Sequence, residues 1–268
     1  MRANISVLGL ASRALVSRWA DRLHKSRQQG ETKIGQWPAK LNFGCGYDKR
    51  EGYLNVDMDP VWAPDVLIVD GDDSAIPRRH FSEVLAKDVL EHIPRPQTLA
   101  ALLDFADYLI LGGKLIIQTS SVLHVAAKLQ EAKSYADHHG WMICLFGNQT
   151  HPGDFHHTGF TEVTLRTHLL AAGFAPAAVE LREEWMFYVE ANKAYDWVSI
   201  VDSSRSLSDL EFLQHAYQAA FYRDVDETGI ENFGAKLREG VPRKQVLKQI
   251  FSAPERLYKT ANLNERSV

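Results

Sequence analysis

Short apolar runs alternate with longer amphipathic stretches between residues 38 and 192. This alternation is typical of a parallel β-sheet that is covered by helices on both faces. The apolar runs predict strands at 39–43, 53–57, 65–69, 83–87, 113–119, 176–182 and 185–191. We therefore predict an α/β domain over residues 36–192.

Two helices of this domain have clear sequence signals at their ends. The helix after the fourth predicted strand has one apolar stripe, made of Leu99, Leu102, Leu103, Ala106 and Leu109. Gly112 is predicted to end this helix, because glycine readily adopts the left-handed conformation found at helix C-termini. A later helix is predicted to begin after Thr161, whose hydroxyl suits an N-cap, and to end at Gly173.

Residues 1–35 are predicted to contain an N-terminal basic amphipathic helix. Its apolar positions recur at helical spacing and are Ile5, Leu8, Leu15, Trp19 and Leu23. Its basic positions are Arg2, Arg13, Arg18, Arg22, Lys25 and Arg27. The simpler interpretation is packing against protein, either this chain or a second copy in a homo-oligomer. The alternative is peripheral contact of residues 1–30 with an anionic membrane surface.

The C-terminal part has a different organisation. Residues 193–205 are predicted to be a linker, and residues 206–268 a small helical domain. Helical stretches are predicted at 206–222, 229–239 and 242–259. The run SAPE at 252–255 is typical of a helix restart.

Composition excludes several classes of protein. The formal net charge of −4 gives no reason to expect general nucleic-acid binding. Two cysteines, Cys45 and Cys144, are too few for a disulfide framework, which favours a reducing cytosolic setting. No apolar run has the length of a transmembrane helix, and the N-terminus lacks the apolar core of a secretory signal. We expect a cytoplasmic protein, peripheral at the inner membrane face only if the N-terminal helix binds lipid.

A glycine turn and an acidic strand end give the first functional indication. The run LNFGCG at 41–46 is an apolar strand followed by Gly44 and Gly46, where backbone can approach a ligand closely. The next strand ends at Asp57, which can accept hydrogen bonds from a ribose diol. Residues 47–54 leave no room for the long helix that a dinucleotide pyrophosphate needs. The spacing therefore favours S-adenosylmethionine, which carries no phosphate, over NAD.

Six segments occur in one order along residues 38–192: LNFGCG (41–46), YLNVDMDP (53–60), DVLIVDGDDSAIP (65–77), VLAKDVLEHIPRP (84–96), LGGKLIIQTSS (111–121) and FHHTGFTEVTLRTHLLAAGF (155–174). They resemble the motifs of class I S-adenosylmethionine-dependent methyltransferases of the small bacterial type with a shortened first helix. The resemblance implies a Rossmann-like, seven-stranded sheet that is closed by an antiparallel hairpin strand in the run EWMFYVEANK. It also implies S-adenosylmethionine as the methyl donor.

The resemblance further implies that the donor is held at the ends of the first four strands. The residues that would line its methionine moiety are Phe43, Gly44, Cys45 and Gly46. The residues that would contact its ribose and adenine are Asp57, Met58, Asp70 and Gly71, with Asp72 or Asp73 as an alternative adenine contact. Cys45 is interpreted as a small turn residue and not as a nucleophile, because no basic partner is near it in sequence.

Asp88 and His92 are the first candidates for catalysis. Asp88 follows the fourth predicted strand and would lie beside the methyl group of the donor, so we also expect it to be a donor-binding residue. His92 comes four residues later and can lie on the same side of a short helical turn. Either residue is a candidate general base for an acceptor hydroxyl, and Asp88 is also a candidate acceptor ligand. In the family, Glu91 and His92 recur mainly as a structural element near the pocket.

A loop predicted at 134–158 has a high density of histidines, namely His138, His139, His151, His156 and His157. It can form a roof over the acceptor pocket, with His156 or His157 contacting the acceptor. Aromatic residues of this region, Trp141, Phe146 and Phe155, suit stacking on a sugar ring or core packing. A metal site at His151, Asp154 and His156 or His157 is a weaker alternative, because the spacing matches no established ligand pattern. We predict no metal.

The C-terminal stretch resembles a small helical domain of unknown function found in bacterial surface-glycan enzymes and large secreted proteins. The matching features are Tyr217, the loop Arg223–Gly229 and the SAPE run. Acidic residues of the loop resemble an incomplete calcium site, but a turn that caps a helix is the simpler interpretation.

Together these features predict an S-adenosylmethionine-dependent O-methyltransferase that acts on a sugar or surface-glycan hydroxyl. The alternatives are a catalytically silent donor-binding scaffold of a glycan-assembly complex and an N- or small-molecule C-methyltransferase. Methylation of amino groups in nucleic acid is not expected, because KDVL stands where those enzymes have an Asp-Pro-Pro-Tyr type motif.

Overall fold

The computed structural model describes residues 37–175 and 178–265. The described residues from Pro38 onwards belong to one compact unit. The predicted N-terminal helix at 1–30 lies outside the described residues, so its packing and its contact with lipid stay predictions.

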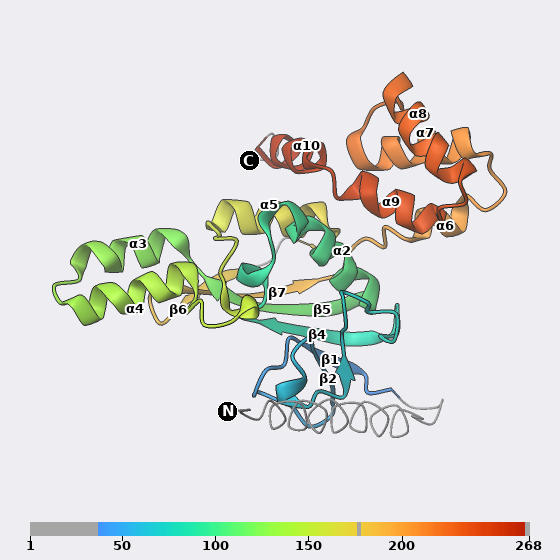
Figure 1. Cartoon of the computed structure of the whole chain (residues 1–268). Coiled ribbons are helices and arrows are strands. Elements are labelled where there is room, and N and C mark those ends of the chain that lie inside the picture. The colour runs from blue at the N-terminus through green and yellow to red at the C-terminus, as the bar shows by residue number, and fades with distance from the viewer. Residues whose placement is uncertain (1–36, 176–177, 266–268) are drawn as a thin grey trace, which may run out of the picture. The chain divides into compact units, whose positions relative to one another are not determined.

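A seven-stranded sheet with the order β3-β2-β1-β4-β5-β7-β6 organises this unit (Figure 1). The strands are β1 (Lys40–Phe43), β2 (Tyr53–Asp57), β3 (Val66–Leu67), β4 (Phe81–Lys87), β5 (Leu109–Ser120), β6 (Val179–Arg182) and β7 (Met186–Asn192). Strands β1 to β5 are parallel to one another, whereas β7 is antiparallel to both β5 and β6. The predicted class I methyltransferase fold, with its antiparallel hairpin strand, is confirmed.

The central strands form the rigid base of the sheet. Leu41 on β1, Val84 on β4 and Leu115 on β5 are fully buried and are neighbours in the strand register. Burying each such side chain favours folding by about 1.5–3 kcal/mol. The loops that follow these strands therefore start from well-fixed positions, as ligand-binding loops of parallel sheets require.

Helix α2 (Thr98–Tyr108) is shorter and β5 is longer than the sequence predicts. The chain becomes extended at Leu109, which pairs with Phe81 on β4. Gly112 was expected to end the helix; it lies inside β5 instead, with a φ of +80°. The prediction was wrong because the pairing of β5 with β4 extends back beyond the glycine. The apolar stripe of the helix is buried as predicted, apart from Leu109, which belongs to the strand.

The connections on the β1–β4 side are short. Residues 44–80, all of them described, contain no α-helix and only the 3-10 helix η1 (Pro60–Trp62). Helix α2 and helix α5 (Glu162–Ala171) contact each other on one face of the sheet (Figure 1). Thr161 caps α5, because its hydroxyl accepts a hydrogen bond from the Thr164 N–H, and the predicted helix start is confirmed.

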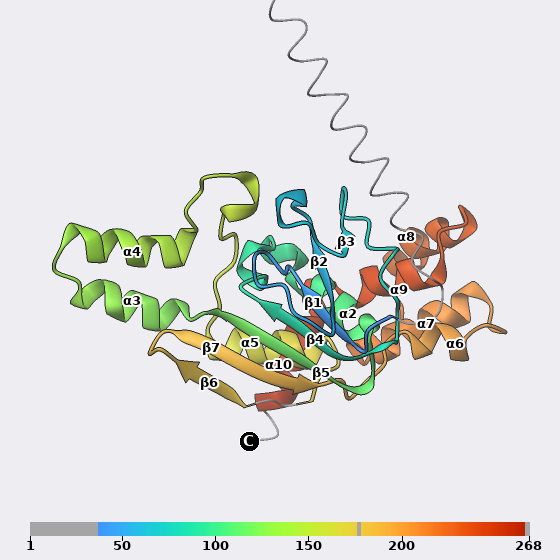
Figure 2. The same cartoon turned by 90° about the horizontal axis from the view of Figure 1, so that it is seen from below.

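The predicted loop at 134–158 is partly helical. Helices α3 (Val122–Glu131) and α4 (Tyr135–Phe146) form a hairpin and lie side by side in both views (Figures 1 and 2). Ser134 caps α4 by accepting a hydrogen bond from the Asp137 N–H. This helix was not predicted because none of its residues is buried, so it has no apolar stripe. The 3-10 helix η4 (Pro152–Asp154) follows in the remaining loop.

The C-terminal part is helical, as predicted. Its helices are α6 (Ser199–Ser203), α7 (Asp209–Phe221), α8 (Glu227–Arg238), α9 (Arg243–Phe251) and α10 (Pro254–Glu265). The expected restart separates α9 from α10. The Asp226 carboxylate caps α8 by accepting from the Gly229 N–H at 2.7 Å, which accounts for this acidic loop without calcium.

Residues 193–205, the predicted linker, include α6 and are partly buried. Lys193 and Trp197 are each 1% exposed, and the Trp197 indole donates to the Leu103 carbonyl of α2 at 3.0 Å. The domain boundaries drawn from the sequence stay predictions. Within residues 37–175 and 178–265, no helix has both the length and the apolar character needed to cross a bilayer.

Candidate functional site

The glycine turn after β1 has a backbone that glycine adopts without strain. Gly44 and Gly46 have φ values of +66° and +48°. A Cβ atom on Gly44 would lie 2.6 Å from Cγ2 of Val89, in the segment after β4. A Cβ atom on Gly46 would meet nothing within 4 Å. Gly44 thus permits close packing of the two strand ends, and Gly46 leaves backbone open to a ligand.

Asp57 is fixed beside this turn. It is the last residue of β2 and is 9% exposed. One carboxylate oxygen accepts from the Gly46 N–H at 2.7 Å, and the other accepts from the Asp59 N–H at 2.9 Å. Each oxygen has a further lone pair. The carboxylate is therefore held in place and still able to accept a hydrogen bond from a ribose hydroxyl.

The surroundings of the turn fit a cationic adenosyl ligand better than a dinucleotide. No helix N-terminus follows the turn, so a pyrophosphate would find no ordered row of N–H donors. The two basic residues after the turn are committed elsewhere: Lys49 donates to the Ala63 carbonyl at 2.7 Å, and Arg50 pairs with Asp48 at 2.8 Å. The charge of Asp57 suits a ligand that carries a sulfonium.

Cys45 lies inside the turn and is 4% exposed. Burial, and next the charge of Asp57, raise the pKa of the Cys45 thiol to about 11. A thiol that stays protonated at neutral pH is a poor nucleophile. Its backbone N–H donates to the Val56 carbonyl at 3.0 Å, so Cys45 joins the turn to β2.

The loop after β3 contains the expected adenine contacts. Asp70 and Gly71 form a tight, exposed turn with φ values of +52° and +75°. Met58, the other residue expected at the adenine, follows β2 and is 67% exposed. Met58, Asp70 and Gly71 are thus all accessible to a ligand at the ends of β2 and β3.

Asp73 is a different case. Its carboxylate accepts from the Arg78 guanidinium and from the Tyr108 hydroxyl. Asp73 is therefore committed to protein groups, and the alternative assignment of this residue to adenine loses its physical basis. Asp72 is exposed, and its carboxylate accepts from the Ser74 N–H at 2.9 Å.

Asp88 follows β4 directly, in the position expected from the sequence. Its φ of +51° is unusual for a residue with a side chain, and such strained positions are enriched at functional sites. The Gln118 side chain on β5 lies 3.5 Å from the Asp88 carboxylate and donates to it. The carboxylate is exposed, but nearby protein displaces part of its hydration and raises its pKa.

His92 and His156 lie together. His92 ends the 3-10 helix η2 (Leu90–His92), and its ring centroid is 4.7 Å from that of His156. The His92 Nδ1 atom is 3.2 Å from the Phe155 carbonyl, and the His156 Nδ1 atom is 3.1 Å from the Cys144 carbonyl. Because a carbonyl only accepts, each Nδ1 carries the proton and each Nε2 keeps a lone pair.

Burial lowers the pKa of both His92 and His156. Both rings are therefore neutral at pH 7. The site thus presents two imidazoles in the tautomer that can take a proton at Nε2, next to the ends of β4 and β5.

His157 joins the same cluster through its backbone. Its N–H donates to the Glu91 carbonyl at 2.7 Å, and its ring stacks on Phe155 at a centroid distance of 6.1 Å. The Glu91 side chain is 3% exposed and accepts from the Thr119 hydroxyl at 3.0 Å. Burial raises the pKa of Glu91 to about 8, so Glu91 is a largely neutral hydrogen-bonding group under the site.

Two polar residues of this site, Gln118 and Thr119, were not predicted. Their sequence signal is the change from the apolar run LII to the polar run QTSS at the end of β5. Polar residues at the carboxyl end of a buried parallel strand indicate a ligand-binding site.

The alternative metal site is not formed. Among the described residues, no three His, Cys, Asp or Glu side chains come together as metal ligands do. The Asp154 carboxylate accepts instead from the Thr150 hydroxyl at 2.8 Å, and His151 Nδ1 accepts from the Gly153 N–H at 3.3 Å. His138 and His139 lie on the exposed helix α4.

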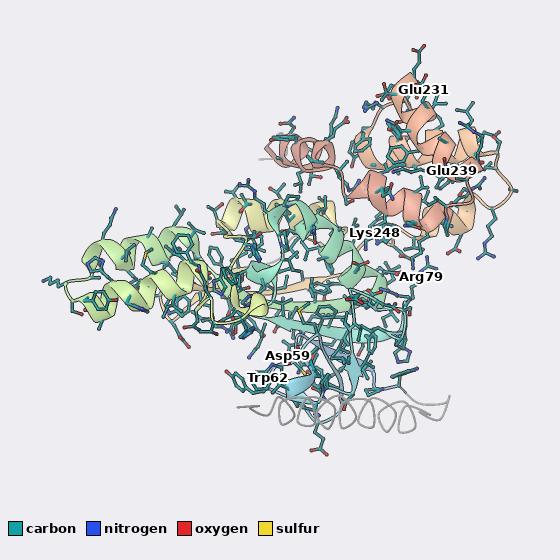
Figure 3. The ribbon with its side chains drawn as sticks, viewed as in Figure 1. Asp59, Trp62, Arg79, Glu231, Glu239 and Lys248 are labelled. Carbon is teal, nitrogen blue, oxygen red and sulfur yellow. The ribbon has the colours of Figure 1, made fainter. Side chains whose placement is uncertain are left out.

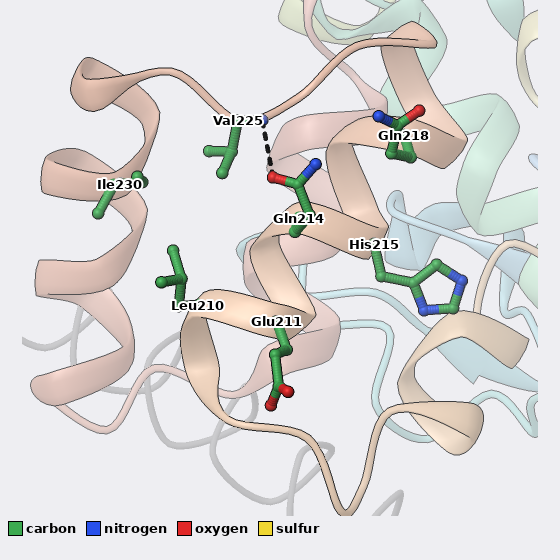
Figure 4. Close-up of a pocket in the computed structure, with 7 residues that line it drawn as sticks. All are labelled: Leu210, Glu211, Gln214, His215, Gln218, Val225 and Ile230. Carbon is green, nitrogen blue, oxygen red and sulfur yellow. Dashed lines mark hydrogen bonds between the residues drawn. The ribbon is translucent and has the colours of Figure 1, made fainter.

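A separate open hollow of about 480 Å³ lies in the C-terminal helices (Figure 4). Its lining comes from α7, the turn after it and α8, and comprises Leu210, Glu211, Gln214, His215, Gln218, Val225 and Ile230. The Gln214 side chain is occupied, because it accepts from the Val225 N–H at 3.2 Å. The hollow contains none of the residues predicted for the donor or for catalysis.

Comparison with known proteins adds the following. Residues 201–259 match a domain of unknown function, DUF4214. No curated protein sequence matches the chain. Similar solved structures include a SAM-dependent methyltransferase from Archaeoglobus fulgidus, at 14% identity and a TM-score of 0.43, covering 68% of this chain and 94% of that one.

Two further similar structures contain S-adenosylhomocysteine. One is the 1,6-didemethyltoxoflavin-N1-methyltransferase of Burkholderia thailandensis, at 16% identity and a TM-score of 0.38, covering 73% of this chain and 94% of that one. The other is the magnesium protoporphyrin IX methyltransferase of Synechocystis PCC 6803, at 14% identity and a TM-score of 0.38, covering 72% and 90%. The strand order and the antiparallel β7 place the first part of the chain in the class I methyltransferase fold, and a DUF4214 domain follows it.

Proposed function

We propose that this chain is an S-adenosylmethionine-dependent O-methyltransferase that acts on a sugar or surface-glycan hydroxyl. The observation that carries the proposal is that two groups of residues lie at the carboxyl ends of the neighbouring strands β1, β2 and β4, where Gly44 lies against Val89. The glycine turn and Asp57 suit the donor, and the His92–His156 pair suits a hydroxyl acceptor. In open α/β sheets, ligands bind where the strand order reverses, which here is between β1 and β4.

When bound, S-adenosylmethionine would supply a methyl group on a sulfonium sulfur, and transfer of the methyl to an attacking oxygen would leave a neutral thioether. Asp57 would hold the ribose hydroxyls, and the turn at Gly44–Gly46 would leave room for the methionine part. His92 takes the proton of the acceptor hydroxyl at Nε2, while Nδ1 stays bonded to the Phe155 carbonyl. His156 and Asp88 orient the acceptor, and His92 later releases the proton to solvent.

The sugar assignment is supported by two features. Phe155 is 36% exposed beside the histidines, and its ring can pack against the apolar face of a sugar. The C-terminal helices match DUF4214, a domain of unknown function, and the sequence resembles a helical domain that also occurs in surface-glycan enzymes. The substrate class itself is tested by a screen of glycan acceptors with labelled donor.

The donor assignment is tested by calorimetry with S-adenosylhomocysteine. We expect the wild type to bind, and Asp57→Asn to bind at least about tenfold more weakly, because a hydrogen bond to a charged group contributes about 1.5–3 kcal/mol. The matched control is Asp65→Asn, since Asp65 also holds strand β2 by accepting from the Asn55 N–H at 2.8 Å but is not at the strand end. It should bind within about twofold of the wild type.

Wild-type protein that binds no S-adenosylhomocysteine would refute the donor assignment as a whole. Equal affinity of the wild type and the folded Asp57→Asn variant would refute only the role of Asp57. Donor binding without methylation of any glycan would instead favour a silent donor-binding scaffold.

A further inference from the structure

A cluster of charged residues connects the DUF4214 helices to the methyltransferase sheet. Its members are Asp73, Arg78, Asp104, Asp107, Tyr108, Lys244 and Lys248, and we call it the charge cluster. Lys244 and Lys248 come from α9, and Figure 3 labels Lys248. The Lys244 Nζ atom lies 2.6 Å from Asp107, and the Lys248 Nζ atom lies 2.6 Å from Asp104, both on α2.

The charges of the cluster balance only when α9 is included. Asp73, Asp104 and Asp107 face Arg78, Lys244 and Lys248. Without the two lysines, Arg78 would be the single cation for all three carboxylates in this set. The neighbouring cations cannot replace them, because Arg79 and Lys193 pair with Asp196 and Asp202.

The charge balance matters most at Asp107, because this carboxylate is buried. Its side chain is 2% exposed, and one of its oxygens has no hydrogen-bond partner. Its other oxygen is 2.6 Å from Lys244 and 3.7 Å from the Arg78 Nε atom. A buried carboxylate that loses one of its two cations is stabilised only if it interacts more strongly with the other. Loss of the Lys244 charge should therefore pull Arg78 towards Asp107.

Arg78 is also the residue that holds the loop after β3. Its guanidinium donates to Asp73, two residues after Gly71, and lies 4.4 Å above the Tyr108 ring. The Tyr108 hydroxyl donates to the other oxygen of Asp73. The Tyr108 ring in turn stacks on Phe43, the last residue of β1, at a centroid distance of 6.1 Å.

The charge cluster thus touches two of the segments assigned to the donor, the end of β1 and the loop after β3. We propose that Lys244 of the DUF4214 domain is a positioning residue for the donor site. By neutralising Asp107, it leaves Arg78 free to hold Asp73 and so fixes the loop at 70–73. This inference rests on the proposed donor site and makes that site dependent on α9.

The test compares S-adenosylhomocysteine affinity in three variants by calorimetry, with thermal unfolding measured in parallel. Lys244→Met should weaken binding at least fivefold, because Arg78 then turns from Asp73 to Asp107. The double variant Asp107→Asn/Lys244→Met removes the competing charge and should bind within twofold of the wild type. Lys114→Met, which breaks the exposed pair with Glu190 on β5 and β7, should also bind like the wild type.

The inference is overturned if folded Lys244→Met binds like the wild type, or if the double variant binds as weakly as Lys244→Met. A merely structural role of Lys244 would lower the melting temperature of both variants and leave affinity unchanged. Lys244→Gln, which keeps a donor but no charge, takes the place of Lys244→Met if the latter does not fold. Wild-type protein without affinity would refute the proposed function and not this inference alone.

Discussion

At the scale of single residues, sequence reasoning found the candidate site but not how its groups are held. Gly44, Asp57 and Asp88 were predictable because each ends or directly follows a strand of clear apolar pattern. The tautomers of His92 and His156 were not, because they depend on carbonyls of Phe155 and Cys144 that are distant in sequence or lie in an unpredicted helix.

The His92 side chain gives a prediction about rate and pH. His92→Asn keeps a donor for the Phe155 carbonyl but removes the Nε2 lone pair, so kcat should fall about 100-fold while donor affinity stays unchanged. His138→Asn on exposed α4 is the matched control and should keep the wild-type kcat. Initial rates with an acceptor from the glycan screen measure both.

The pH dependence follows from the direction of the pKa shift. Burial lowers the pKa of His92, and the base is its neutral form, which predominates above that pKa. The kcat of the wild type should therefore rise with pH, with the midpoint of the rise below about pH 6.5, the ordinary pKa of histidine. A rising limb centred well above that value would contradict His92 as the base.

At the scale of secondary structure, the buried elements were predictable and the exposed ones were not. The parallel strands have continuous apolar patterns because both faces of the sheet must be buried. Helix α2 has an apolar stripe because one of its faces must be buried. Helix α4 has no buried residue, so only its cap at Ser134 marks it. The start of β5 at Leu109 depends on pairing with Phe81, a long-range contact that no local pattern reveals.

Arg256 on α10 joins the ends of two helices. Its guanidinium is buried and donates to the carbonyls of Ala171 on α5 and of Ala219 and Ala220 on α7, at 2.7–3.2 Å. These carbonyls lie in the last turns of their helices, where a cation is favourable. Arg256 therefore links the methyltransferase fold to the DUF4214 helices. It does so through hydrogen bonds to backbone carbonyls and not through an ion pair with a carboxylate.

Arg256→Met should lower the free energy of unfolding by about 3 kcal/mol, because it leaves buried carbonyls without a donor. Urea denaturation followed by circular dichroism measures the loss. Arg205→Met is the control, since that side chain is 79% exposed, and it should change the free energy by less than about 0.5 kcal/mol. A loss at Arg256 as small as that of the control would show that solvent replaces these bonds.

At the scale of the whole molecule, the sequence separates a methyltransferase part from a helical part, whereas the structure joins the described residues from Pro38 onwards in one compact unit. The reason is that the joining residues are polar or isolated in sequence. Lys244, Lys248 and Arg256 look like ordinary surface charges, and only their partners at Asp107, Asp104 and Ala171 show that they cross between the two parts.

Unfolding of the protein should therefore be a single cooperative transition. In calorimetry, the measured enthalpy should equal the van't Hoff enthalpy, as for one cooperative unit. A chain cut after residue 198 should fail to fold, since it removes α9 and α10, which pack on α2 and α5. Two resolved transitions, or a folded truncated chain, would mean that the two parts are stable independently.

The residues proposed for the donor and the histidine cluster come from different segments of the chain, and this has an evolutionary consequence. The donor groups follow β1 to β3, whereas the histidine cluster is completed by residues 155–157, which come after the α3–α4 hairpin. Exchanges in residues 122–146 can reach the histidine cluster through the Cys144 carbonyl, which lies 3.1 Å from His156 Nδ1. Under the proposed function, the acceptor side of the site can therefore change while the residues proposed for the donor keep their sequence.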